Sequence, residues 1–217
     1  SNKTEHIVIE EGITGIGSEA FAGFVKVLSV NIPYTVKKIK RNSFENNYRL
    51  REIQIPNEVI SIGDKAFAGC HGLKNLSLPS KLNYVGSFEF CKNIKSISLP
   101  DSTKDTADGM FTGCEMLTSV KLPRKLKAIK AYDFADCRKL TKLNIPVTVK
   151  VVYMSAFAGS GLKKIVLPSN VQKIRNGNDG QKVFEYIKGI GYPTKNLRVI
   201  EIHSKKVKSI QKNSFSG

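Results

Sequence analysis

The stretch Leu50–Cys70, LREIQIPNEVISIGDKAFAGC, holds the pattern that decides the fold. Ile53 and Ile55 alternate with polar residues directly before Pro56, and a period of two is typical of a short strand with one buried face. After the proline, further apolar residues lead to the Ala-Phe pair that ends on Phe67. The stretch therefore predicts a strand, a proline corner, a short extended piece and a compact return leg.

The same pattern recurs along nearly the whole chain. Prolines occur in steps of 23, 23, 21, 23, 23 and 22 residues, at Pro33, Pro56, Pro79, Pro100, Pro123, Pro146 and Pro168. The phenylalanine recurs at Phe21, Phe44, Phe67, Phe111, Phe134, Phe157 and Phe215, and Phe88 best fits the shortened repeat. Partial units at 7–9 and 200–202 bring the predicted strand segments to nine. A period of this length means a stack of similar coils.

A 20 to 29 residue unit of the form L-x-x-L-x-L is the leucine-rich repeat pattern. The 23-residue unit of this chain, L-x-x-I-x-L-P-x-x-V-x-x-I-G-x-x-A-F-x-x-C, resembles the BspA-like class of bacterial leucine-rich repeats. We therefore expect a right-handed solenoid of the α/β type, with one parallel curved sheet on its concave face and short irregular or helical return legs. We expect one domain over residues 1–217. Because the sequence starts in a strand and stops inside a repeat, we expect it to be part of a longer protein.

Two segments depart from the repeat. Residues 101–108 lack the apolar residues expected after Pro100, which predicts a coil that is loosely packed on one side. The step from Pro168 to the equivalent His203 is 35 residues, so we expect an insertion over residues 175–196 to bulge out of the solenoid.

The basic charge is concentrated in the second half of the chain. The composition, 41% hydrophobic and 24% charged, is that of a folded domain, and no stretch approaches the ~18 apolar residues of a membrane helix. Residues 1–108 contain 14 basic and 12 acidic side chains, whereas residues 109–217 contain 21 and 6. An acidic partner is the usual implication of such an excess.

Four cysteines, Cys70, Cys91, Cys114 and Cys137, occupy one repeat position in successive units. Equivalent positions stack in a row about 4.8 Å apart, and a row cannot surround one metal ion. Parallel side chains also disfavour disulfides. The spacing therefore predicts buried, reduced thiols and no metal site.

No motif in the sequence predicts catalysis. Gly15, Gly17 and Ala20 superficially fit a dinucleotide loop, but the repeat explains them and leaves no room for a helical crossover. The three histidines fall at different repeat positions, and no nucleophile has a matching base. We expect neither an enzyme nor a cofactor.

The residues that flank the middle strand position are predicted to face outward. That face is polar and becomes basic midway along the array, at Lys121, Lys142, Asn144 and Lys164, with Arg124, Lys127 and Lys150 on the adjoining corner segments. Stacked like charges repel one another unless water or an anion screens them. The sequence leaves two alternatives for these residues: a solvated surface or a binding site.

The resemblance implies a secreted or cell-surface bacterial protein that attaches to macromolecules. The first expectation is an adhesin-like module that binds a host or microbial surface protein. The alternatives are a binder of acidic polysaccharide, through the basic half, and a passive spacer. Nucleic acid is not expected, because the sequence lacks the aromatic residues that stack on bases. We expect a monomer with no membrane-spanning segment.

Overall fold

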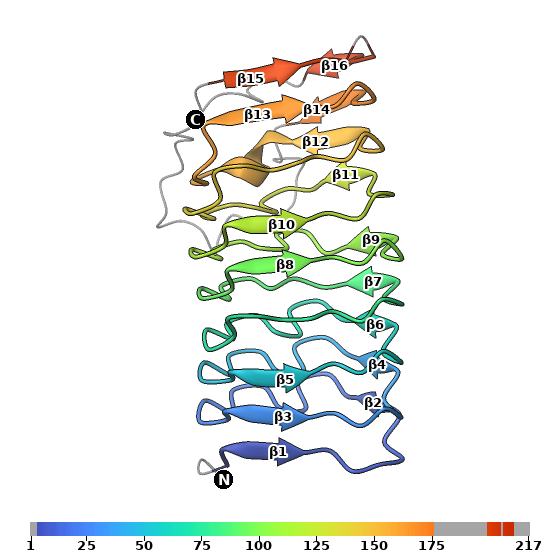
Figure 1. Ribbon diagram of the computed structural model, residues 1–217, viewed down its shortest axis with the longest axis vertical. Coiled ribbons are helices and arrows are strands. Elements are labelled where there is room, and N and C mark those ends of the chain that lie inside the picture. The colour runs from blue at the N-terminus through green and yellow to red at the C-terminus, as the bar shows by residue number, and fades with distance from the viewer. Residues whose placement is uncertain (1–3, 176–198, 205, 211–217) are drawn as a thin grey trace.

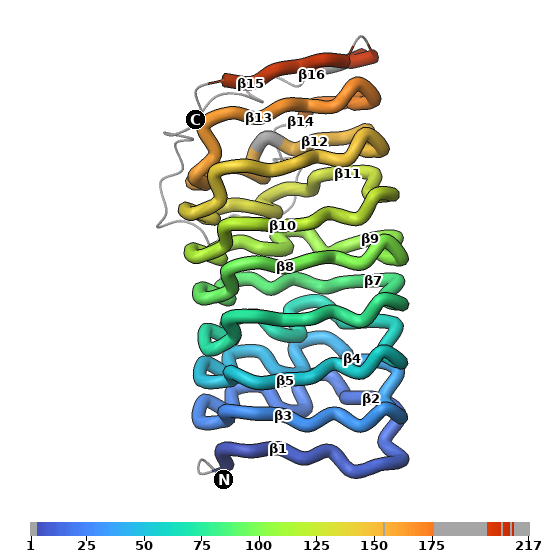
Figure 2. The backbone as a smooth tube through the Cα atoms, in the orientation of Figure 1, coloured from blue at the N-terminus to red at the C-terminus, as the bar shows by residue number. Residues whose placement is uncertain are grey.

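The computed structural model describes residues 4–175, 199–204 and 206–210 as a parallel β-solenoid (Figure 1). The backbone tube shows coils stacked along one axis, with β1 at one end and β15 and β16 at the other (Figure 2). The predicted solenoid of short parallel strands is therefore confirmed. The predicted insertion over residues 175–196 lies almost entirely outside the described residues.

A first stack of strands follows the predicted apolar pairs, and its strands are the arrows that point right in Figure 1. Its members are β1 (His6–Val8), β3 (Ser29–Asn31), β5 (Glu52–Gln54), β8 (Ser96–Ser98), β10 (Ser119–Lys121), β13 (Lys164–Leu167) and β15 (Val199–Ile202). Pairing is parallel and in register with the repeat, as between Val30 and Ile53. Of the nine predicted segments, the one at Leu76 keeps only an Asn75–Ser96 bridge, and residues 141–146 form no strand.

The strands of a second stack follow the proline corner in each repeat, and they are the arrows that point left in Figure 1. Its members are β2 (Gly15–Ile16), β4 (Lys38–Ile39), β6 (Ser61–Ile62), β7 (Tyr84–Val85), β9 (Asp105–Thr106), β11 (Ala128–Ile129), β12 (Val151–Tyr153), β14 (Lys173–Arg175) and β16 (Ser209–Ile210). The prediction of a single sheet is therefore wrong in detail, since the strands form two stacks. The second-stack strands have only two or three residues, which is too short for an alternating pattern to be visible in the sequence. They pair in parallel because equivalent residues of successive coils lie next to one another.

The two stacks and the return legs enclose one core. The repeat phenylalanines form a column through it, in which Phe44, Phe67, Phe88, Phe111, Phe134 and Phe157 are fully buried. Neighbouring rings are stacked, with centroids 5.4 to 6.2 Å apart, and all pairs except the inclined Phe111–Phe134 pair are nearly parallel. One short 3-10 helix, η1 (Met154–Phe157), replaces the irregular return leg in a late coil.

The four cysteines form the predicted row of free, buried thiols beside the phenylalanine column. Each thiol donates a hydrogen bond to a phenylalanine carbonyl of the preceding coil, as from Cys91 Sγ to the oxygen of Phe67 at 3.0 Å. Burial raises the pKa of the Cys91 thiol to about 12. The thiols are therefore protonated at neutral pH, and each donates its hydrogen bond to a carbonyl inside the core.

The coil over residues 101–108 differs from its prediction. Thr103 and Thr106 occupy the apolar core positions, are 1% and 2% exposed, and Thr106 belongs to β9, which pairs with β7. A threonine fits a strand because its β-branched shape resembles valine. The coil is therefore closed instead of loose, although the buried Thr103 hydroxyl has no hydrogen-bond partner.

Candidate binding surfaces

The seven predicted binding residues lie on exposed positions of the basic half, but not all on strands. Lys121 and Lys164 stand on β10 and β13, whereas Lys142 and Asn144 belong to the intervening coil that forms no strand. The corner residues Arg124, Lys127 and Lys150 are also exposed, and the Lys150 N–H donates to the Lys127 carbonyl at 2.8 Å. The structure thus brings the residues to adjacent coils at four repeat positions, which pair Lys142 with Lys164, Lys121 with Asn144 and Lys127 with Lys150 and leave Arg124 at a position of its own.

Carboxylates neutralise two of these predicted residues. Lys164 Nζ lies 2.7 Å from Glu201 Oε1. The Arg124 Nε donates to Asp101 Oδ2 at 2.7 Å, and the Arg124 backbone N–H donates to Asp101 Oδ1 at 2.8 Å. These hydrogen bonds from Arg124 hold the pKa of Asp101 below its usual range.

The other four lysines of the set are not paired in this way. In the part of the chain that the structure describes, no carboxylate lies within ion-pair distance of Lys121, Lys127, Lys142 or Lys150. We call these four residues the basic patch. The side chains of these four residues are exposed, and none forms an ion pair with a described carboxylate, although the charge of Lys121 helps to lower the pKa of Asp101.

A second surface, which the sequence reasoning did not single out, is a hollow of about 750 Å³ that is lined by residues of the second-stack strands and of the return legs. It spans five coils, from Glu45 through Asp64, Tyr84 and Asp105 to Lys130, and no residue of the first-stack strands lines it.

One short coil creates this hollow. In ordinary coils the phenylalanine comes five positions after the last strand residue of the second stack, as Phe67 does after Ile62. Val85 and Phe88 are only three apart, so the outward corner formed by Asp64-Lys65 in the preceding coil is missing. At Gly86 the chain approaches that coil so closely that a Cβ would clash with the carbonyl of Gly63.

The missing corner also interrupts the hydrogen bonds between return legs. In neighbouring coils the N–H groups of Asn42 and Phe44 donate to the next coil, at 3.0 and 2.8 Å. The equivalent N–H groups of Lys65 and Phe67 have no backbone acceptor among the described residues, because the residues that would accept are absent from the short coil. Only the bond from Gly69 to Glu89, at 2.7 Å, remains.

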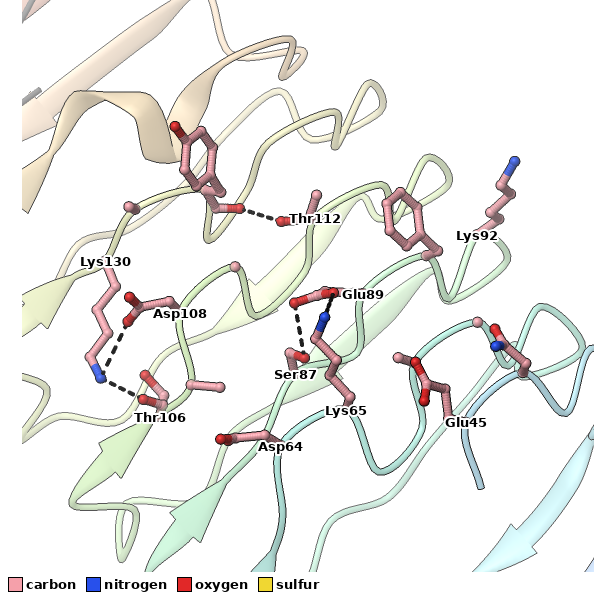
Figure 3. Close-up of a pocket in the computed structure, with 18 of the residues that line it drawn as sticks. Glu45, Asp64, Lys65, Ser87, Glu89, Lys92, Thr106, Asp108, Thr112 and Lys130 are labelled. Atoms are coloured by element: carbon pink, nitrogen blue, oxygen red, sulfur yellow. Dashed lines mark hydrogen bonds and ion pairs between the residues drawn. The ribbon is translucent and has the colours of Figure 1, made fainter. Parts of the chain in front are cut away.

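Polar side chains connect the coils across the gap (Figure 3). Lys65 Nζ lies 3.3 Å from Glu89 Oε2, and the Tyr84 hydroxyl donates to Asp64. On the far wall, Lys130 Nζ contacts Asp105 at 3.0 Å and Asp108 at 3.6 Å, and donates to the Thr106 carbonyl at 2.6 Å. The hollow is thus lined by ion pairs that are formed inside it.

Asp133 lies buried beside the far wall. Its carboxylate accepts the backbone N–H of Lys130 at 2.7 Å and that of Met110 at 3.3 Å. The side chain is 3% exposed, and burial raises the pKa of Asp133 to about 8.

The described residues contain no group of three or more His, Cys, Asp or Glu side chains arranged to hold a metal ion. Nor does any helix among them have the length and hydropathy to cross a membrane. The histidines lie apart: His6 bonds Ser29, His71 stacks on Tyr48, and His203 contacts Glu201.

Sequence reasoning missed the hollow, although one signal for it was present. The step from Pro79 to Pro100 is 21 residues instead of 23, and the lost pair falls between Val85 and Phe88. A deletion at a corner shortens one coil, whereas the corners of the neighbouring coils still project outward. A shortened repeat therefore predicts a depression in the surface over that coil.

Known proteins share both the repeat and the fold. The family model of the BspA-type leucine-rich repeat region matches in six copies, over residues 1–90 and 86–188. The leucine-rich repeat protein TpLRR of T. pallidum is 29% identical, with a TM-score of 0.63, over 68% of this chain and 72% of that protein. A Bacteroides ovatus leucine-rich repeat protein is 26% identical, with a TM-score of 0.64, over 94% of this chain. A Eubacterium ventriosum one is 25% identical, with a TM-score of 0.66, over 75% of this chain.

The chain spans 62% of the B. ovatus protein and 45% of the E. ventriosum protein. No curated protein sequence matches it. The family model covers most of the chain, and the structural matches agree with it. The chain therefore belongs to the BspA-type leucine-rich repeat family.

Proposed function

We propose that this chain is a non-catalytic binding module of a secreted or cell-surface bacterial protein, and that its basic half contacts an acidic macromolecule. One observation carries the proposal: the four lysines of the basic patch lie on adjacent coils with no carboxylate in ion-pair distance among the described residues. Coils rise by about 4.8 Å each, so Lys127 and Lys150, which hold the same repeat position on adjacent coils, present charges at a spacing that an extended anionic chain can follow. The surplus charge of residues 109–217 adds a positive field around them.

A protein partner is the second candidate, and a separate observation favours it. Val166 and Val199 are 43% and 45% exposed on the paired strands β13 and β15. They flank the Lys164–Glu201 ion pair. Apolar side chains around a paired charge form a surface that a protein interface can bury. In a passive spacer, by contrast, neither surface would bind.

Heparin, a sulfated polysaccharide, is a suitable probe of the basic patch. We expect the wild-type chain to bind immobilised heparin, and the affinity to fall steeply between about 50 and about 200 mM salt, by analogy with counter-ion release from nucleic acid. Each exposed lysine contributes little alone, so the informative variant changes Lys121, Lys127 and Lys142 to Ala together. Its affinity should fall at least about tenfold, with an unchanged unfolding midpoint.

A matched control removes the same charge from the nearly neutral half. Lys26, Lys37 and Lys81 are exposed and make no ion pair among the described residues, so changing them to Ala should leave binding nearly unchanged. Equal losses in both triple variants would mean that only net charge matters. Absence of heparin binding at low salt would leave the basic patch as a solvated surface.

A further inference from the structure

We infer that the hollow over the short coil is a binding site for an uncharged oligosaccharide, separate from the basic patch. Its volume, about 750 Å³, lies within the range of about 300–1,000 Å³ typical of ligand pockets. It extends over five coils, which gives an open groove along the solenoid axis instead of a closed cavity.

Two aromatic residues line the hollow in a backbone conformation that aromatic residues avoid. Phe90 has φ 58° and Tyr132 has φ 62°, both in the left-handed region. The residues at the position of Phe90 in other coils include Gly23, Asn46, Gly69, Gly113 and Asp136, and those at the position of Tyr132 include Glu19, Asn42 and Gly109. Glycine and asparagine adopt this conformation at lower cost, and strained residues of this kind concentrate at ligand sites.

Neighbouring groups hold both aromatic residues in place. A Cβ at Gly113 would clash with the ring of Phe90, so this glycine leaves room for the ring. Thr112 Oγ1 donates to the Tyr132 carbonyl at 2.8 Å, and Tyr132 is 9% exposed. Phe90 is partly exposed, so its fixed ring can stack against the apolar face of a sugar ring without ordering on binding, whereas the buried Tyr132 forms part of the wall of the hollow.

The polar lining indicates that the ligand carries no charge. An anion would meet the carboxylates of Glu45, Asp64, Glu89, Asp105 and Asp108. A cation would compete with Lys65 and Lys130 for oxygens that are already paired. Sugar hydroxyls avoid both costs, because a carboxylate oxygen accepts further hydrogen bonds while it keeps its ion pair, and ammonium groups still have protons to donate.

Calorimetric titration of the 217-residue chain tests this inference, with cellohexaose, maltohexaose, mannohexaose and chitohexaose as probes. At least one should bind, with an affinity that changes less than about twofold between about 50 and about 200 mM salt, because an uncharged ligand is insensitive to screening. The double variant Phe90→Asn and Tyr132→Asn should bind that sugar at least about tenfold more weakly. Its unfolding midpoint should fall, because the buried Tyr132 ring is lost, but the variant should still fold, since asparagine fills the same two positions at Asn46 and Asn42.

The control places asparagine at the same two repeat positions outside the hollow, as Glu19→Asn and Asp136→Asn, and should bind like the wild type. Should the test variant fail to fold, amide chemical shifts of the wild-type chain during the titration locate the site independently. Shifts confined to residues that line the hollow support the inference. Binding of none of the four sugars, shifts elsewhere, undiminished binding by the folded test variant, or salt-sensitive binding of hexalysine in the hollow would overturn it.

Discussion

Truncation of one phenylalanine in the middle of the column measures how much each coil depends on its neighbours. Phe67 is fully buried, and its ring stacks on Phe44 at 5.4 Å and on Phe88 at 6.2 Å. Phe67→Ala therefore opens a cavity that two other coils share. The loss combines the transfer of the ring to water with that closed cavity, and should reduce the free energy of unfolding by about 3–5 kcal/mol.

Phe21 provides the matched comparison at the end of the column. It stacks on Phe44 at 5.4 Å but is only partly buried, and its second aromatic neighbour is Phe24 of the same coil. Phe21→Ala loses the transfer term without a closed cavity and should cost about 1.5–3 kcal/mol. Urea unfolding of both variants gives the two losses. Equal losses, or a loss at Phe67 below about 2 kcal/mol, would refute the shared core.

Two further predictions concern buried groups. Titration with a thiol reagent should find no reactive thiol in the folded chain and four after unfolding, because burial raises the pKa values of Cys70, Cys91, Cys114 and Cys137; a stoichiometric metal or two disulfides would contradict this result. Asp133 has its pKa raised to about 8, so the folded state keeps a proton that the unfolded state loses above its ordinary pKa of about 3.9. The free energy of unfolding should therefore fall with rising pH between about 4 and about 8, by up to about 1.4 kcal/mol per pH unit. Asp133→Asn should remove this slope in urea unfolding, and an unchanged slope would assign it to other groups.

The sequence predicted the parts of this fold that repeat. The apolar pairs, the phenylalanine column and the cysteine row follow from one coil written several times, because equivalent residues of stacked coils must lie next to one another. The outward strand positions were predicted for the same reason, and Lys121, Lys142 and Lys164 are indeed exposed.

The features that were missed depend on contacts between unlike coils. The partners of Lys164 and Arg124 come from neighbouring coils, and nothing in the repeat predicts whether a given carboxylate will reach them. The hollow arises from two residues that are lacking, which a search for matching motifs passes over. At Thr103 the sequence predicted a departure from the repeat that the structure does not have. Its polar side chain suggested a loose coil, but the residue is buried in the core.

Hydrogen exchange of single backbone amides tests the central structural claim, that return legs bond coil to coil except where the short coil opens the hollow. The N–H groups of Glu19, Asn42 and Gly109 donate to the next coil at 3.1, 3.0 and 2.9 Å, whereas the equivalent N–H of Lys65 has no backbone acceptor among the described residues. Glu19 and Lys65 are both exposed, so exposure alone does not distinguish them. NMR under native conditions should show slow exchange at Glu19, Asn42 and Gly109 and fast exchange at Lys65. Equal protection at Lys65 would mean that the short coil closes the gap and would contradict the account.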